Sequence, residues 1–133
     1  MKSVWLAALA LLVATPAFAA LPPIYYQQAR TNAADVVVIN VSEVGQPPEI
    51  GYGDCPVKGT IAVVERGTTY AVGDAITITV PCRLPNAPIM VGGVQWKSFE
   101  SLSAAPAGRA FLNDGALALY QYDVLAEAPA AAQ

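Results

Sequence analysis

The chain has 133 residues, a net charge of −3 and no histidine. This length suits one domain with a single modest core. The seven Lys and Arg residues are scattered and form no basic stripe for a phosphate backbone, so a nucleic-acid partner is not expected. Lack of histidine removes the commonest general base and metal ligand. Paired carboxylates or a Ser–Lys pair would not need histidine, but no such constellation can be assembled, so we predict no catalytic residue, metal or cofactor.

Residues 1–19 have the three parts of a secretory signal peptide. Lys2 supplies the positive charge, Val4–Val13 is an apolar run too short to span a bilayer, and Ala17-Phe18-Ala19 is a cleavage pattern. Cleavage after Ala19 leaves 114 residues with six cations, ten acidic residues and a net charge of −4. The sequence therefore predicts a periplasmic or secreted protein with no transmembrane segment in the mature chain.

The first half of the mature chain predicts a lead-in segment and three strands. Residues 20–33 are the lead-in, with a short helical turn over about Tyr25–Arg30. β-Branched residues then predict a strand that starts at Asp35 and continues to residue 44. Residues 45–56 hold three prolines and three glycines and are predicted as a loop. Two further strands follow over residues 58–66 and 74–80, and the second alternates cleanly between apolar and small polar residues, as in an antiparallel sheet.

Two cysteines, Cys55 and Cys82, predict a structural disulfide in an exported protein. A metal–thiolate or free-thiol role is the alternative, but no supporting ligand lies near either residue in the sequence. A turn centred between Thr68 and Thr69 would place Ile61 opposite Ile76 and Cys55 opposite Cys82. We therefore expect the disulfide to join directly opposed residues at the open end of a hairpin.

The second half of the chain predicts two more strands and an ambiguous connection. Residues 94–102 follow a Pro/Gly-rich loop and fit either a strand or, preferably, an irregular or helical connection. A strand over 107–112 and one over 116–125 flank Asn113-Asp114-Gly115, a strong hairpin turn. Residues 126–133 are predicted as a disordered tail. The fold class that follows is mainly all-β, a small five- to six-stranded Greek-key barrel or sandwich with one disulfide and room for a short helix.

Residues 34–125 resemble the netrin-like version of the OB-fold, the family that includes the tissue inhibitors of metalloproteinases. The matching motifs are Ala34-Asp35 before the first strand, Val64-Glu65-Arg66-Gly67, Gly73–Ile76, Cys82 after that strand, and Gly115–Tyr120. The resemblance implies an OB-like barrel and a protease-inhibitor-like role. Those inhibitors chelate zinc through an N-terminal cysteine, whereas here the predicted mature end is Ala20-Leu21-Pro22-Pro23. The zinc-chelating mechanism therefore does not carry over.

Four aromatic residues form the candidate binding surface: Tyr25, Tyr26, Trp96 and Phe99. Each also fits a structural interpretation, because the tyrosines could plug one end of the barrel and the other two could be partly buried core. The predicted function is a non-enzymatic binding module for another envelope or extracellular protein. The alternatives are a carrier of a small apolar or glycan ligand in the barrel mouth, and a protease-inhibitor-like protein that lacks the N-terminal cysteine.

Overall fold

A computed structural model of the chain describes residues 21–88 and 92–129. The predicted signal peptide and the last four residues of the predicted tail lie outside this part. The described elements, in chain order, are α1 (Pro23–Asn32), β1 (Asp35–Val44), β2 (Tyr52–Arg66), β3 (Ala75–Arg83), β4 (Lys97–Ser98), α2 (Phe99–Ala104), β5 (Ala107–Asn113) and β6 (Ala116–Leu125). Within this part of the chain, neither helix is long and apolar enough to cross a membrane.

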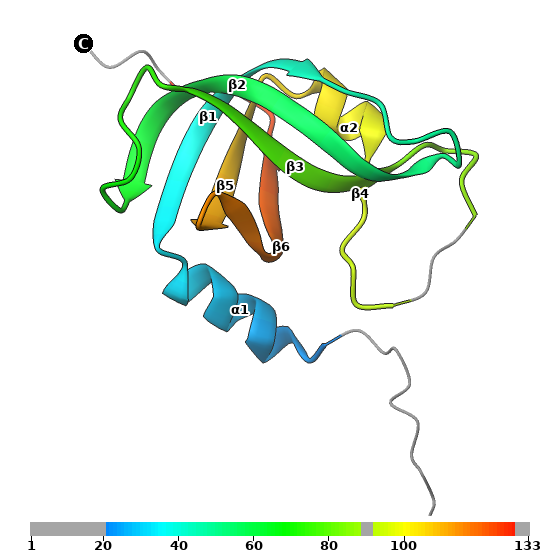
Figure 1. Cartoon of the computed structure of the whole chain (residues 1–133), viewed down its shortest axis with the longest axis horizontal. Helices are drawn as coiled ribbons and strands as arrows, with labels where there is room; N and C mark the ends of the chain where they lie inside the picture. The colour runs from blue at the N-terminus through cyan, green and yellow to red at the C-terminus, as the bar shows by residue number, and fades with distance from the viewer. Residues whose placement is uncertain (1–20, 89–91, 130–133) are drawn as a thin grey trace, which may run out of the picture.

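All six strands belong to one curled sheet, in the order β4-β3-β2-β1-β5-β6. Strands β1, β2 and β3 form an antiparallel meander, the β5–β6 hairpin joins the other side of β1, and β4 pairs parallel to β3. In Figure 1 β2 and β3 arch over the hairpin, and α1 lies beneath it. Strands β3 and β6 come into contact at the seam without a hydrogen-bonded ladder. This is the predicted mainly-β, OB-like arrangement, present as a partly open barrel.

The core fills the concave side of the sheet. Alternate residues of each strand point inward, as the pattern of β3 predicts, whereas Thr77 and Thr79 on the other face are exposed. A second, smaller cluster lies under α1 and includes Val36 and Phe111. The main cluster consists of Val37, Ile39, Cys55, Val57, Ile61, Ile78, Val80, Cys82, Leu102, Ala110, Leu112 and Tyr122. The sheet thus has one apolar and one largely wet face over β2 and β3, whereas the first half of β1 is buried on both faces.

Strand β2 begins at Tyr52, so the prediction of a loop up to Pro56 is wrong over its last five residues. Proline lacks the N–H that a ladder needs, and it usually marks a strand edge or a loop. Here the Pro56 carbonyl accepts a hydrogen bond from the Gly45 N–H at 2.8 Å. The N and C=O of one strand residue point to the same side, so the missing N–H faces the end of β1. The ladder between β2 and β3 therefore continues past Pro56.

The predicted disulfide between Cys55 and Cys82 is present, but its predicted register is wrong by two residues. Cys55 pairs with Val80, and Gly53 pairs with Cys82, so the disulfide joins diagonal neighbours with Cα atoms 5.8 Å apart. The cause lies in the β2–β3 connection. The Asp35 carboxylate accepts hydrogen bonds from the Thr69 N–H and hydroxyl at 3.3 and 2.9 Å. This long-range contact holds the connection, for which the sequence predicts only a turn centred between Thr68 and Thr69.

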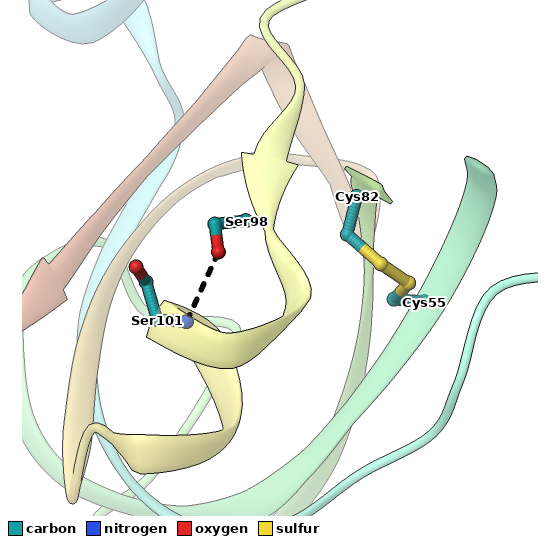
Figure 2. The surroundings of a disulfide bond; sticks show 4 residues. All are labelled: Cys55, Cys82, Ser98 and Ser101. Atoms are coloured by element: carbon teal, nitrogen blue, oxygen red, sulfur yellow. Dashed lines mark hydrogen bonds between the residues drawn. A yellow bond between two sulfur atoms is a disulfide. The ribbon is translucent and has the colours of Figure 1, made fainter. Parts of the chain in front are cut away.

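Four further predictions have clear outcomes. The helical turn in the lead-in segment is a full helix, α1, and β6 has its predicted limits. The Asn113-Asp114-Gly115 turn is confirmed, since Asp114 and Gly115 have φ of 51° and 82°, the two left-handed positions of a type I′ turn. The ambiguous segment 94–102 contains the two-residue strand β4 and most of α2. The Ser98 hydroxyl caps α2 by accepting from the Ser101 N–H at 3.4 Å (Figure 2).

The buried phenol of Tyr122 predicts a loss of stability at high pH. Tyr122 is 2% exposed, and burial raises the pKa of its phenol from 10.0 to about 12. Because the unfolded chain loses this proton first, the stabilisation is complete below pH 10. It is lost as the pH rises to about 12, by roughly 2–3 kcal/mol.

Urea unfolding at several pH values between 9 and about 11.5 measures this loss. Tyr122→Phe keeps the ring and removes the titrating group, so its free energy of unfolding should fall less steeply over the same range. Equal pH slopes for the two proteins would contradict the assignment to Tyr122.

Candidate functional site

Three segments meet at the end of the sheet that carries the disulfide. They are the end of the β1–β2 connection, the start of the β3–β4 connection, and the residues just before and within β4. The Leu84 N–H donates to the Gly51 carbonyl at 2.7 Å, and the strand pair Cys82–Lys97 joins β3 to β4. The disulfide between Cys55 and Cys82 ties β2 to β3 (Figure 2), and Cys82 is itself the residue that pairs with Lys97. The three segments are thereby held in a fixed relative position.

Apolar side chains lie on this frame. Tyr52 and Trp96 pack edge to face, with ring centroids 5.5 Å apart and an angle of 80° between the rings. Both are half-buried, as is Leu84, whereas Ile50 is 61% exposed. We call Ile50, Tyr52, Leu84 and Trp96 the loop platform. It gathers residues that are far apart in the sequence at the end of the sheet that carries the disulfide.

A pocket of about 340 Å³ opens beside the platform. Its lining consists of Arg83, Leu84, Pro85, Ser98 and Glu100. Arg83 and Ser98 are neighbours across the β3–β4 pair. Arg83 and Glu100 both line the pocket, yet no ion pair joins them or links either to another residue in the described part of the chain. The pocket therefore presents one positive and one negative side chain that do not form an ion pair with each other.

A separate polar cluster fastens α1 to β6. Arg30 donates two hydrogen bonds to the Asp123 carboxylate, at 2.5 and 3.0 Å, and one to the Gln121 side chain at 2.7 Å. Its guanidinium also lies 4.6 Å from the centre of the Phe111 ring. Gln121 is 3% exposed and donates in turn to Gln95 at 2.7 Å. The polar groups of this cluster form hydrogen bonds with one another, so its role is to hold α1 against β6.

The four aromatic residues predicted as a binding surface occupy different environments. Trp96 belongs to the loop platform, whereas Phe99 packs against the main core. The Tyr26 hydroxyl donates to the Gly93 carbonyl at 3.1 Å and ties α1 to the segment that leads to Trp96. Tyr25 lies on α1 and is 49% exposed. Neither a hydrogen bond nor a ring contact among the described residues joins the two tyrosines to Trp96.

Sequence reasoning did not find Ile50, Tyr52 or Arg83. Ile50 and Tyr52 lie in a stretch that was predicted as a loop, and Arg83 follows a predicted strand end. The available signal was an aromatic and an apolar residue inside a Pro/Gly-rich segment directly before a cysteine. Such residues are often positioned for binding by a rigid scaffold.

One ion pair in the described part lies away from the loop platform, between β2 and β5. The hydrogen bond from Arg109 to Glu65 raises the pKa of the Arg109 guanidinium, and this ion pair lies on the outer side of the sheet. Among residues 21–88 and 92–129, no cluster of three or more His, Cys, Asp or Glu side chains could hold a metal ion. Comparison of the chain with protein-family models, with curated proteins and with solved structures finds no match.

Proposed function

We propose that this protein is an exported, non-enzymatic binding module that recognises another envelope or extracellular protein through the loop platform. The observation that carries the proposal is the half-buried Tyr52–Trp96 pair next to the exposed Ile50, on a support closed by a disulfide. Tyr and Trp are enriched among the few residues that carry most of the binding energy of a protein interface. A support that is already ordered reduces the entropy cost of association.

The compartment is the second part of the proposal. A signal peptide over residues 1–19 would deliver the chain to an oxidising environment, where disulfides form and persist. The disulfide joins β2 to β3 close to Tyr52, and the two cysteines form this bond only in such an environment. Export would therefore provide the oxidising conditions under which the disulfide that supports the binding surface forms. The netrin-like resemblance belongs to the same proposal and concerns the OB-like barrel alone.

Ile50→Asp should weaken partner binding at least tenfold, because the change puts a charge into an apolar contact (about 1.4 kcal/mol per tenfold). Val72→Asp is a matched control. Val72 is also 61% exposed, but it lies in the connection at the other end of β2. The measurement is site-specific photocrosslinking in living cells of the source, with the photoreactive residue placed at position 50, 96 or 72.

The expected result is one discrete adduct from positions 50 and 96 that position 72 does not give, and that disappears when Trp96→Ala is combined with the probe at 50. Binding of the identified partner to the purified Ile50→Asp and Val72→Asp proteins then gives the affinity ratio. Equal crosslinking from all three positions, or equal loss of affinity in both variants, would reject the platform as the binding surface.

A further inference from the structure

We propose that the pocket beside the loop platform receives a carboxylate of the bound partner, and that Arg83 is the residue that anchors it. This inference rests on the proposed function, since the platform brings the partner to the pocket. The shared residue Leu84 makes the two sites continuous. The pocket therefore lies where an acidic side chain at the edge of a docked surface would arrive.

The donors in the pocket are suited to a carboxylate. The exposed Arg83 has a planar fork of N–H groups that forms no ion pair with any residue described. Such a fork binds a carboxylate through two parallel hydrogen bonds. The adjacent Ser98 hydroxyl accepts from the Ser101 N–H, so its own hydrogen is still available to donate. Together these groups can supply three hydrogen bonds to one carboxylate.

Glu100 on the same lining limits what the pocket accepts. Its carboxylate repels a second negative charge, so a singly charged carboxylate is favoured over a doubly charged phosphate. Arg83, Pro85, Ser98 and Glu100 are all exposed, so the pocket is an open depression. A free small molecule needs most of its surface buried to bind tightly. The open shape therefore favours a side chain that a protein delivers, because the platform supplies the rest of the binding energy.

Nuclear magnetic resonance titration of the ¹⁵N-labelled protein tests the pocket without the partner. The probe is capped glutamate (N-acetyl-glutamate α-amide), with capped glutamine as its neutral isostere and inorganic phosphate as the doubly charged probe. With capped glutamate, we expect the signals of the Arg83 Nε–H and of the Ser98 and Ser101 amides to shift and to saturate, with a Kd in the millimolar range. Capped glutamine should give none, and phosphate should bind more weakly.

Arg83→Gln should weaken the binding of capped glutamate at least about tenfold, because both charge-assisted hydrogen bonds are lost. Lys58→Gln is the control. Lys58 is also an exposed cation, but it pairs with Thr77, about 20 Å from Arg83 along β3 at roughly 3.3 Å per residue. Equal binding of capped glutamine, tighter binding of phosphate, or unchanged binding by Arg83→Gln would overturn the proposal.

The two proposals fail separately. If capped glutamate does not bind but the crosslinks at positions 50 and 96 remain specific, the platform stands and the carboxylate pocket is wrong. If capped glutamate binds at Arg83 but position 72 crosslinks as well as position 50, the protein-binding platform is wrong. Arg83→Gln in the complex with the identified partner then decides whether the pocket acts in that interface.

Discussion

Replacing Cys55 and Cys82 together with alanine should lower the free energy of unfolding by about 3–4 kcal/mol. The disulfide closes a loop with a sequence separation of 27, and the chain-entropy model gives about this value for such a loop. Both cysteines are fully buried in the main core, so alanine is the suitable replacement and a serine would bury an unpaired hydroxyl. The loss is a large part of the stability of a small domain.

Calorimetry and urea unfolding measure this effect. The midpoint temperature should fall by roughly 15 °C for a domain of this size. A reducing agent should lower the midpoint of the native protein in the same direction and leave the double alanine variant unchanged. A native protein that is as stable reduced as oxidised would show that the fold does not depend on the disulfide.

Local patterns were sufficient to predict most strands. β-Branched residues marked β1, alternation marked β3, and the Asn-Asp-Gly turn fixed both strands of the last hairpin. Each of these signals acts between residues that are close in the sequence. The prediction failed where turn-forming residues lie within a strand. The prolines and glycines of 45–56 suggested a loop, but Pro56 sits at a position where β1 ends and no N–H is required.

The register of β2 and β3 depended on a contact that the sequence pattern does not reveal. Asp35 is 4% exposed and holds Thr69 through its carboxylate, so the connection between the two strands is longer than a tight turn. The ladder then starts at Ile61, whose N–H bonds to the Asp74 carbonyl. An aspartate that precedes a strand has many possible partners, so only the folded chain identifies this one.

The pairing of β5 with β6 contains an irregularity that the sequence pattern also does not reveal. Residues 118–121 lie opposite the single residue Phe111, and both Leu119 and Tyr120 have positive φ, 43° and 61°. Two such residues in succession are strained, and the Gln121 side chain offsets part of this by donating to the Leu119 carbonyl at 2.8 Å. Simple alternation predicts none of this. The candidate site is subject to the same limit, since pairing across β3 and β4 is what places Arg83 beside Ser98.

Gly108→Ala should be among the most destabilising single substitutions in the chain, by about 3 kcal/mol. Gly108 lies in β5 and Tyr122 in β6, where Tyr122 pairs with Ala110, so the ring crosses the glycine diagonally. A Cβ at Gly108 would overlap the Tyr122 hydroxyl and the ring carbon that bears it. The ring is rigid and only 2% exposed, so it cannot move aside without disturbing the core.

A double-mutant cycle separates this overlap from a general cost of alanine in the strand. Tyr122→Leu removes the atoms that the new methyl group would meet, so Gly108→Ala should cost less than about 1 kcal/mol on that background, a coupling of about 2 kcal/mol. Gly93→Ala is the matched control, because a Cβ there meets nothing within 4 Å, and it should change stability by less than about 0.5 kcal/mol. If Gly108→Ala costs the same with Tyr122 and with Leu at position 122, then the ring does not determine the glycine. A strong coupling would show that one cross-strand aromatic contact fixes how closely β5 and β6 pack.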